Sequence, residues 1–120
     1  SSRLEVSSTI RPPTDKALYN AHHQKLVYQA LVLLIANKKY EEATCLVDNR
    51  EFDKAAILLS ENSKFLSDNI FYMQDSSLIL LKVQNDTYAG SLDSIEDMSE
   101  DDYKYMQKQN KVNVYDNNRK

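Results

Sequence analysis

Glycine and proline are nearly absent from this chain, and their scarcity limits the folds that are open to it. The 120 residues hold one glycine, Gly90, and two prolines, Pro12 and Pro13. Sandwiches and barrels of β-strands need many tight turns, which glycine and proline supply. Phosphate-binding loops and the nucleophile elbow of hydrolases also require glycine. The composition therefore predicts an all-α fold and disfavours most classes of enzyme.

Apolar side chains recur at helical spacing from Thr14 to Asp48, and this segment predicts one long helix. A helix of about 32 residues is about 48 Å long, whereas a compact domain of this size is only about 35 Å across. The helix therefore either breaks near Asn37 or extends beyond its own domain, where a partner surface would have to cover it. The periodicity continues through Asn37 and favours the unbroken helix. The residues of this apolar face are Leu26, Ala30, Leu33, Ala36, Tyr40, Ala43 and Val47.

A second helical face begins at Phe52 and predicts an antiparallel helical hairpin. Residues 48–50 form the tight connection, in which Asn49 is expected to cap the second helix. Alanines on both helices allow the two backbones to approach closely. The second face consists of Phe52, Ala55, Ala56, Leu59, Ser63 and Leu66. The expected core of the hairpin consists of Leu26, Leu33, Tyr40, Phe52 and Leu59.

Two shorter helices are expected after the hairpin. The leucine-rich residues 76–88 suit either a helix or a buried strand, and their helical neighbours favour a helix. Gly90 is expected to end this helix in the left-handed conformation. Ser99 followed by Asp102 resembles a capping box and predicts a further helix over residues 100–109.

The two ends of the chain differ from this helical region. Residues 1–13 alternate apolar and polar side chains as a strand does, and Pro12-Pro13 stops the pattern, so they form an N-terminal arm or a β-strand. Residues 110–120 are rich in asparagine and lysine and predict a polar tail. The expected organisation is thus an arm or strand over residues 1–13, a helical domain over residues 14–109, and a tail over residues 110–120.

No polar residues form a recognisable catalytic or metal-binding motif. His22 and His23 lie about 100 degrees apart on a helix and cannot face one metal ion, so we expect His22 on the core side and His23 in solvent. Cys45 has apolar neighbours and suits a small core residue. Six acids within residues 93–102 lack the spacing of a calcium-binding loop and suit the start of a helix. We expect no catalytic residue, no cofactor and no metal ligand.

Tyrosines gather in the last third of the chain and are the candidate interface residues. A tyrosine combines a large contact area with a polar tip, which favours it at protein interfaces. The same side chains can equally cover the edge of a small core, and the sequence leaves both interpretations open. The candidates are Tyr88, Tyr103, Tyr105 and Tyr115.

Charge and composition narrow the class of partner. The net charge of −3 disfavours nucleic acid, because domains that bind nucleic acid usually carry a basic face. Basic residues near the C-terminus lack the glycine-rich or aromatic platform that a phosphate site needs: Lys104, Lys108, Lys111, Arg119 and Lys120. No apolar run approaches the roughly 18 residues of a membrane helix, so no membrane span is expected. The single cysteine suits a reducing compartment, and we expect a cytoplasmic protein.

An aromatic–acid–x–alanine pattern occurs at residues 40–43 and again at residues 52–55. The pattern suits a tetratricopeptide-like helical pair, but a repeat of about 34 residues is not visible. A tetratricopeptide-like module that binds peptides is therefore an alternative interpretation, and it would expose Tyr or Asn side chains on a concave face.

The order of motifs also resembles the helical C-terminal region that follows the β-sandwich in multidomain von Willebrand factor A proteins. These include the group in which a related segment accompanies a Hedgehog/intein-like module. The resemblance covers about Val6 to Arg119, although Asn49-Arg50 replace the usual glycine of the hairpin turn. It implies a scaffold without catalytic residues that packs against neighbouring A-type and sandwich domains. The matching residues are Glu42-Ala43, Leu46, Asp48, Phe52, Ala55-Ala56, Leu78 to Leu81, Met98, Tyr103, Lys108 and Asn117-Asn118-Arg119.

These features together favour a non-catalytic helical scaffold or protein-interaction module within a larger multidomain protein. Its partner is another protein or a neighbouring domain of the parent chain. A small metal-binding protein or an enzyme is the remote third interpretation, because it would require His22, Cys45 and the acids in one site.

Overall fold

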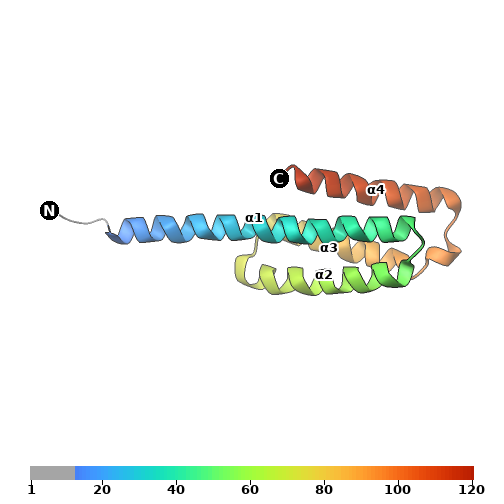
Figure 1. Cartoon of the computed structure of the whole chain (residues 1–120), viewed down its shortest axis with the longest axis horizontal. Coiled ribbons are helices and arrows are strands. Elements are labelled where there is room, and N and C mark those ends of the chain that lie inside the picture. The colour runs from blue at the N-terminus through green and yellow to red at the C-terminus, as the bar shows by residue number, and fades with distance from the viewer. Residues whose placement is uncertain (1–12) are drawn as a thin grey trace. The chain divides into compact units, whose positions relative to one another are not determined.

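The computed structural model describes residues 13–120, and this part of the chain is helical and contains no β-strand (Figure 1). The predicted all-α class is confirmed. Apart from Pro13, the predicted N-terminal arm or strand lies outside the described residues. The chain divides into two compact units, residues 1–30 and residues 31–120. The elements are α1 (Pro13–Asp48), α2 (Phe52–Met73), α3 (Ser76–Leu92), the short 3-10 helix η1 (Ile95–Asp97) and α4 (Glu100–Asn118).

Helix α1 is continuous across Asn37, as the apolar periodicity predicted. Asparagine often weakens a helix because its side chain competes for nearby backbone groups. Here the Nδ2 of Asn37 instead donates to the carbonyl oxygen of Val114 on α4, at 3.0 Å. Because this hydrogen bond to α4 occupies the side-chain amide, the amide does not compete for the backbone groups of α1. The α1 residues that the second unit buries follow the predicted face and include Ala36, Tyr40, Ala43 and Val47.

The predicted core of the hairpin is correct in the second unit and wrong in the first. Tyr40 and Leu59 are buried, and Leu33 and Phe52 pack partly buried against the same core. Leu26 is 49% exposed, and His22, expected on the core side, is also exposed. The described residues of the first unit form a single helix, so its apolar stripe has no second element within that unit to pack against.

The turn between α1 and α2 closes by backbone bonds and not by the predicted side-chain cap. Arg50 adopts the left-handed conformation with φ of 63°. Its amide donates to the carbonyl oxygen of Val47 at 2.9 Å, and the amide of Glu51 donates to that of Leu46 at 2.8 Å. This is the Schellman arrangement, which usually places glycine at the left-handed position. The prediction that Asn49 caps α2 is wrong, because Glu51 precedes the helix and forms no side-chain cap.

Gly90 does not end α3 as predicted. Helix α3 continues to Leu92, and Gly90 has no positive φ. The left-handed positions among the described residues are Arg50 and Gln74, and the Gln74 amide closes the end of α2 by donating to the carbonyl oxygen of Ile70 at 2.8 Å. Each left-handed non-glycine residue costs about 1 to 2 kcal/mol.

Helix α4 begins as predicted and ends later than predicted. The Ser99 side chain accepts a hydrogen bond from the backbone amide of Asp102 at 3.1 Å, which satisfies one of the free amides of the first turn. The helix does not stop near Gln109 but continues to Asn118. The prediction of a polar tail over residues 110–120 is therefore wrong. The reason is that this segment buries several side chains against the rest of the second unit: Asn110, Val114 and Asn117.

Replacing Gly90 by alanine tests the placement of this residue inside α3. A Cβ atom at Gly90 would meet no atom within 4 Å, and alanine is about 1 kcal/mol more favourable than glycine inside a helix. We expect Gly90→Ala to raise the free energy of unfolding by about 1 kcal/mol in urea titrations. The reverse exchange one residue earlier, Ala89→Gly, should lower it by at least as much. A destabilised Gly90→Ala variant would instead indicate a left-handed cap.

Candidate functional site

A network of buried amide side chains joins three helices of the second unit. The Nδ2 of Asn62 on α2 donates to the carbonyl oxygen of Ala36 on α1 at 3.0 Å and to the Oδ1 of Asn85 on α3 at 2.9 Å. The Nδ2 of Asn85 donates in turn to the carbonyl oxygen of Leu59 at 2.8 Å. Both asparagines are completely buried. Polar bonds inside the core therefore fix the positions of α1, α2 and α3 relative to one another.

A second set of buried amide side chains attaches α4. The Nδ2 of Asn117 donates to the Oδ1 of Asn37 at 3.2 Å, and the hydroxyl of Tyr40 donates to the Oδ1 of Asn110. Amides outnumber apolar side chains among the buried residues of α4, which are Met106, Gln107, Asn110, Val114 and Asn117. Directional hydrogen bonds, more than apolar contact, therefore determine where α4 lies.

Two buried tyrosines link this network to the end of α1. The rings of Tyr40 and Tyr88 pack edge to face with their centroids 6.0 Å apart. The Tyr88 hydroxyl donates to the Oε1 of Gln107. The Nε2 of Gln107 donates to the Oδ1 of Asp48 at 2.8 Å. Burial raises the pKa of Tyr40 to about 12. Burial, reinforced by the charge of Asp48, also raises the pKa of Tyr88 above its ordinary value. Both hydroxyls are therefore neutral donors at neutral pH.

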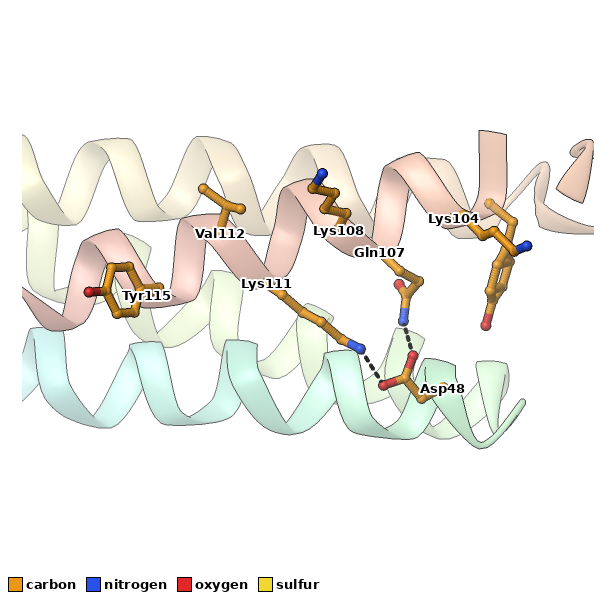
Figure 2. Close-up of a pocket in the computed structure, with 8 residues that line it drawn as sticks. Asp48, Lys104, Gln107, Lys108, Lys111, Val112 and Tyr115 are labelled. Atoms are coloured by element: carbon orange, nitrogen blue, oxygen red, sulfur yellow. Dashed lines mark hydrogen bonds and ion pairs between the residues drawn. The ribbon is translucent and has the colours of Figure 1, made fainter. Parts of the chain in front are cut away.

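A groove of about 550 Å³ lies between α4 and the last residue of α1 (Figure 2). Asp48 uses both carboxylate oxygens inside it, because Oδ1 accepts from Gln107 and Oδ2 accepts from the Nζ of Lys111 at 2.7 Å. Lys104 and Lys108 form no ion pair with any residue in the described part of the chain. The residues that line the groove are Asp48, Tyr103, Lys104, Gln107, Lys108, Lys111, Val112 and Tyr115.

The electrostatics of the groove follow from the environment of Asp48. Burial alone would raise the pKa of this carboxyl. Hydrogen bonds from Lys111 and Gln107, with the charge of Lys111, hold the pKa below its ordinary value. Asp48 is therefore negatively charged at neutral pH and balances Lys111, whereas Lys104 and Lys108 have no ion-pair partner in the described part of the chain.

The four tyrosines that the sequence marked as interface candidates have different environments. Tyr88 is buried, so of the two interpretations left open by the sequence, the core applies to this residue. Tyr103 is partly buried, and its hydroxyl donates to the carbonyl oxygen of Val47 at 2.9 Å. Tyr105 and Tyr115 are 70% and 62% exposed. Tyr103 and Tyr115 line the groove, whereas Tyr105 does not.

The other candidate residues do not form a site. Cys45 was expected in the core and is exposed, because it lies beside the buried stripe of α1 and not on it. Within residues 13–120, no three His, Cys, Asp or Glu side chains are placed to hold a metal ion. The asparagines that a tetratricopeptide-like groove would expose include several that are buried in the amide network: Asn37, Asn62, Asn85, Asn110 and Asn117.

Large apolar side chains are exposed in both units. In the first unit every side chain over residues 16–28 is exposed, and five large apolar ones are between 47% and 68% exposed: Leu18, Tyr19, Leu26, Val27 and Tyr28. In the second unit the exposed group includes Leu31, Leu34 and Ile35 on α1. The neighbouring rings of Phe71 and Tyr72 at the end of α2 are exposed as well, and they stack with centroids 5.2 Å apart.

Comparison of the chain with protein-family models, with curated proteins and with solved structures gives no match. Over the described residues, no helix combines the length and the apolar character needed to cross a membrane.

Asn62→Ala tests whether the amide network stabilises the second unit. The substitution leaves the Oδ1 of Asn85 without its donor inside the core, and an unsatisfied buried group costs about 1 to 3 kcal/mol. We expect the free energy of unfolding in urea to fall by that amount. In a double-mutant cycle, Asn85→Ala should lose less in the Asn62→Ala background than in the native protein. Gln109→Ala, on the exposed side of α4, is the control and should change stability little.

The buried tyrosines predict a loss of stability at alkaline pH. A tyrosine whose pKa is raised by folding stabilises the folded state fully below its unfolded pKa of about 10. Tyr40 should lose this contribution as the pH rises from about 10 to 12, by about 1.4 kcal/mol per pH unit. Urea titrations between pH 9 and 11 should show the decline. It should be smaller in Tyr40→Phe and in Tyr88→Phe and unchanged in the exposed control Tyr115→Phe; equal slopes in all four proteins would contradict the prediction.

Proposed function

We propose that this chain is a non-catalytic helical module that acts by binding another protein, with the exposed apolar helix of the first unit as its binding surface. The proposal rests on one observation: the first unit exposes Leu18, Tyr19, Leu26, Val27 and Tyr28 to solvent. Groups of large exposed apolar side chains mark protein or membrane interaction sites.

The spacing of these residues explains why a partner is needed. Consecutive residues on a helix lie about 100 degrees apart, so Leu26, Val27 and Tyr28 spread over more than half of the helix circumference. Large apolar side chains that spread this far around one turn of a helix are normally covered by a protein or a membrane. In the second unit, most of the buried polar side chains form hydrogen bonds between helices, which supports the non-catalytic part of the proposal.

The partner is a separate protein or a neighbouring domain of the same polypeptide. The resemblance to the helical region of multidomain von Willebrand factor A proteins favours a neighbouring domain, because that region serves as a scaffold there. Cys45 is exposed and unpaired, which suits a reducing compartment such as the cytoplasm.

Substitution of Leu26, Val27 and Tyr28 by glutamine tests the binding surface. We expect the native chain to self-associate in light scattering and to enhance the fluorescence of an apolar dye, because its apolar helix is uncovered. The triple variant should be monomeric and should bind less dye, with helix content retained, since glutamine is a good helix former.

Ile57→Gln is the matched control, because Ile57 is 60% exposed on α2 and lies outside the proposed surface. It should associate and bind dye as the native chain does. A native chain that is monomeric and does not bind dye would overturn the proposal. So would a triple variant that associates like the native chain.

A further inference from the structure

We propose that the groove beside α4 binds a short acidic peptide segment in which carboxylates flank an aromatic or large apolar residue. This surface belongs to the second unit and is separate from the apolar helix of the first unit. The inference rests on the charge and the lining of the groove together.

The positive charge of the groove is available to a ligand. Lys104 and Lys108 lie one helical turn apart, so their Cβ atoms are about 6 Å apart on one face. Lys111 follows on the same face and is already held by Asp48 at 2.7 Å. Two carboxylates separated by a similar distance would therefore meet Lys104 and Lys108 without breaking an existing ion pair.

The rest of the lining suits an apolar residue between those carboxylates. Val112 is partly exposed, Tyr115 is largely exposed, and the Tyr103 ring forms part of the wall. The Arg50 guanidinium lies 4.4 Å from the centroid of the Tyr103 ring, in cation–π geometry. Arg50 adds further positive charge beside the groove and covers one face of the ring. A ring or branched side chain in the groove would contact Val112 and Tyr115 while its neighbours face the lysines.

Charge along α4 favours a short peptide over a nucleic acid. Glu100, Asp101 and Asp102 are exposed in the first turn of α4, immediately before Lys104. A long polyanion that continued along the helix would meet these acids and be repelled. The lysines themselves, from Lys104 to Lys111, span only about 10 Å along the helix axis, which a few residues of extended peptide can cover.

Fluorescence anisotropy on the full chain tests this site with a defined probe. The probe is a labelled peptide in which one phenylalanine is flanked on both sides by glutamates. Exposed ion pairs are individually weak and are screened by salt, so we expect saturable but weak binding that falls as salt is added. In the Lys104→Glu/Lys108→Glu variant the affinity should fall at least about tenfold, because attraction at two positions becomes repulsion.

Four controls separate this proposal from simpler explanations. Lys54→Glu/Lys64→Glu makes the same charge change on exposed side chains of α2 and should bind the probe within about twofold of the native chain. A probe with glutamine in place of glutamate should bind much more weakly, and so should one with glycine in place of phenylalanine. Circular dichroism should show unchanged folding for Lys104→Glu/Lys108→Glu, because both lysines are exposed.

Two results would overturn the assignment. The first is equal loss of probe binding in the groove variant and the α2 control, which would indicate attraction to overall charge. The second is tighter binding of a single-stranded oligothymidylate than of the peptide, which would identify the groove as a nucleic-acid site. Both results are distinguishable from a failure of the binding surface proposed for the first unit, because Leu26, Val27 and Tyr28 are unchanged in both lysine variants.

Discussion

The buried amide network determines the arrangement of the second unit more than its apolar contacts do. Apolar burial is not directional and tolerates small shifts of one helix along another. Hydrogen bonds between Asn37 and Asn117, and between Tyr40 and Asn110, are satisfied in one register only. A displaced α4 would leave these groups buried without partners, at about 1 to 3 kcal/mol each. The position of α4, and with it the groove, therefore depends on these bonds.

Periodicity predicted the helices well, because the spacing of apolar residues reports directly on which face is buried. It gave the continuity of α1 and the start of α2, and the capping pattern of Ser99 and Asp102 gave the first turn of α4. Single-residue signals performed worse. Gly90 suggested a left-handed helix end, yet Arg50 and Gln74 adopt that conformation. Their backbone amides donate to carbonyl oxygens of the preceding turn. These hydrogen bonds offset the conformational cost of a left-handed non-glycine residue, which residue preferences alone do not take into account.

The groove and most of the network are not predictable from hydropathy, because hydropathy predicts that polar side chains are exposed. Residues 110–120 read as a tail, but several of their asparagines are buried with partners on other helices. Hydropathy cannot distinguish a buried, bonded asparagine from an exposed one. Tyr103 and Tyr115 were identified as candidates, and Tyr88 was as well, although it lies in the core. The helical spacing of Lys104, Lys108 and Lys111 was visible in the sequence, but the opposing Asp48 comes from a distant helix.

A single chain of bonds connects the core to the proposed acidic-peptide site. Tyr88 donates to Gln107, Gln107 donates to Asp48, and Asp48 accepts from Lys111. The site is thus held by groups whose positions are set inside the bundle, which lowers the ordering cost of binding. The pairing of Asp48 with Lys111 also divides the lysines by role. Lys111 pairs with Asp48 within the fold, whereas Lys104 and Lys108 can pair with the carboxylates of a ligand. The same small polar network therefore stabilises the fold and determines which ligands the groove selects.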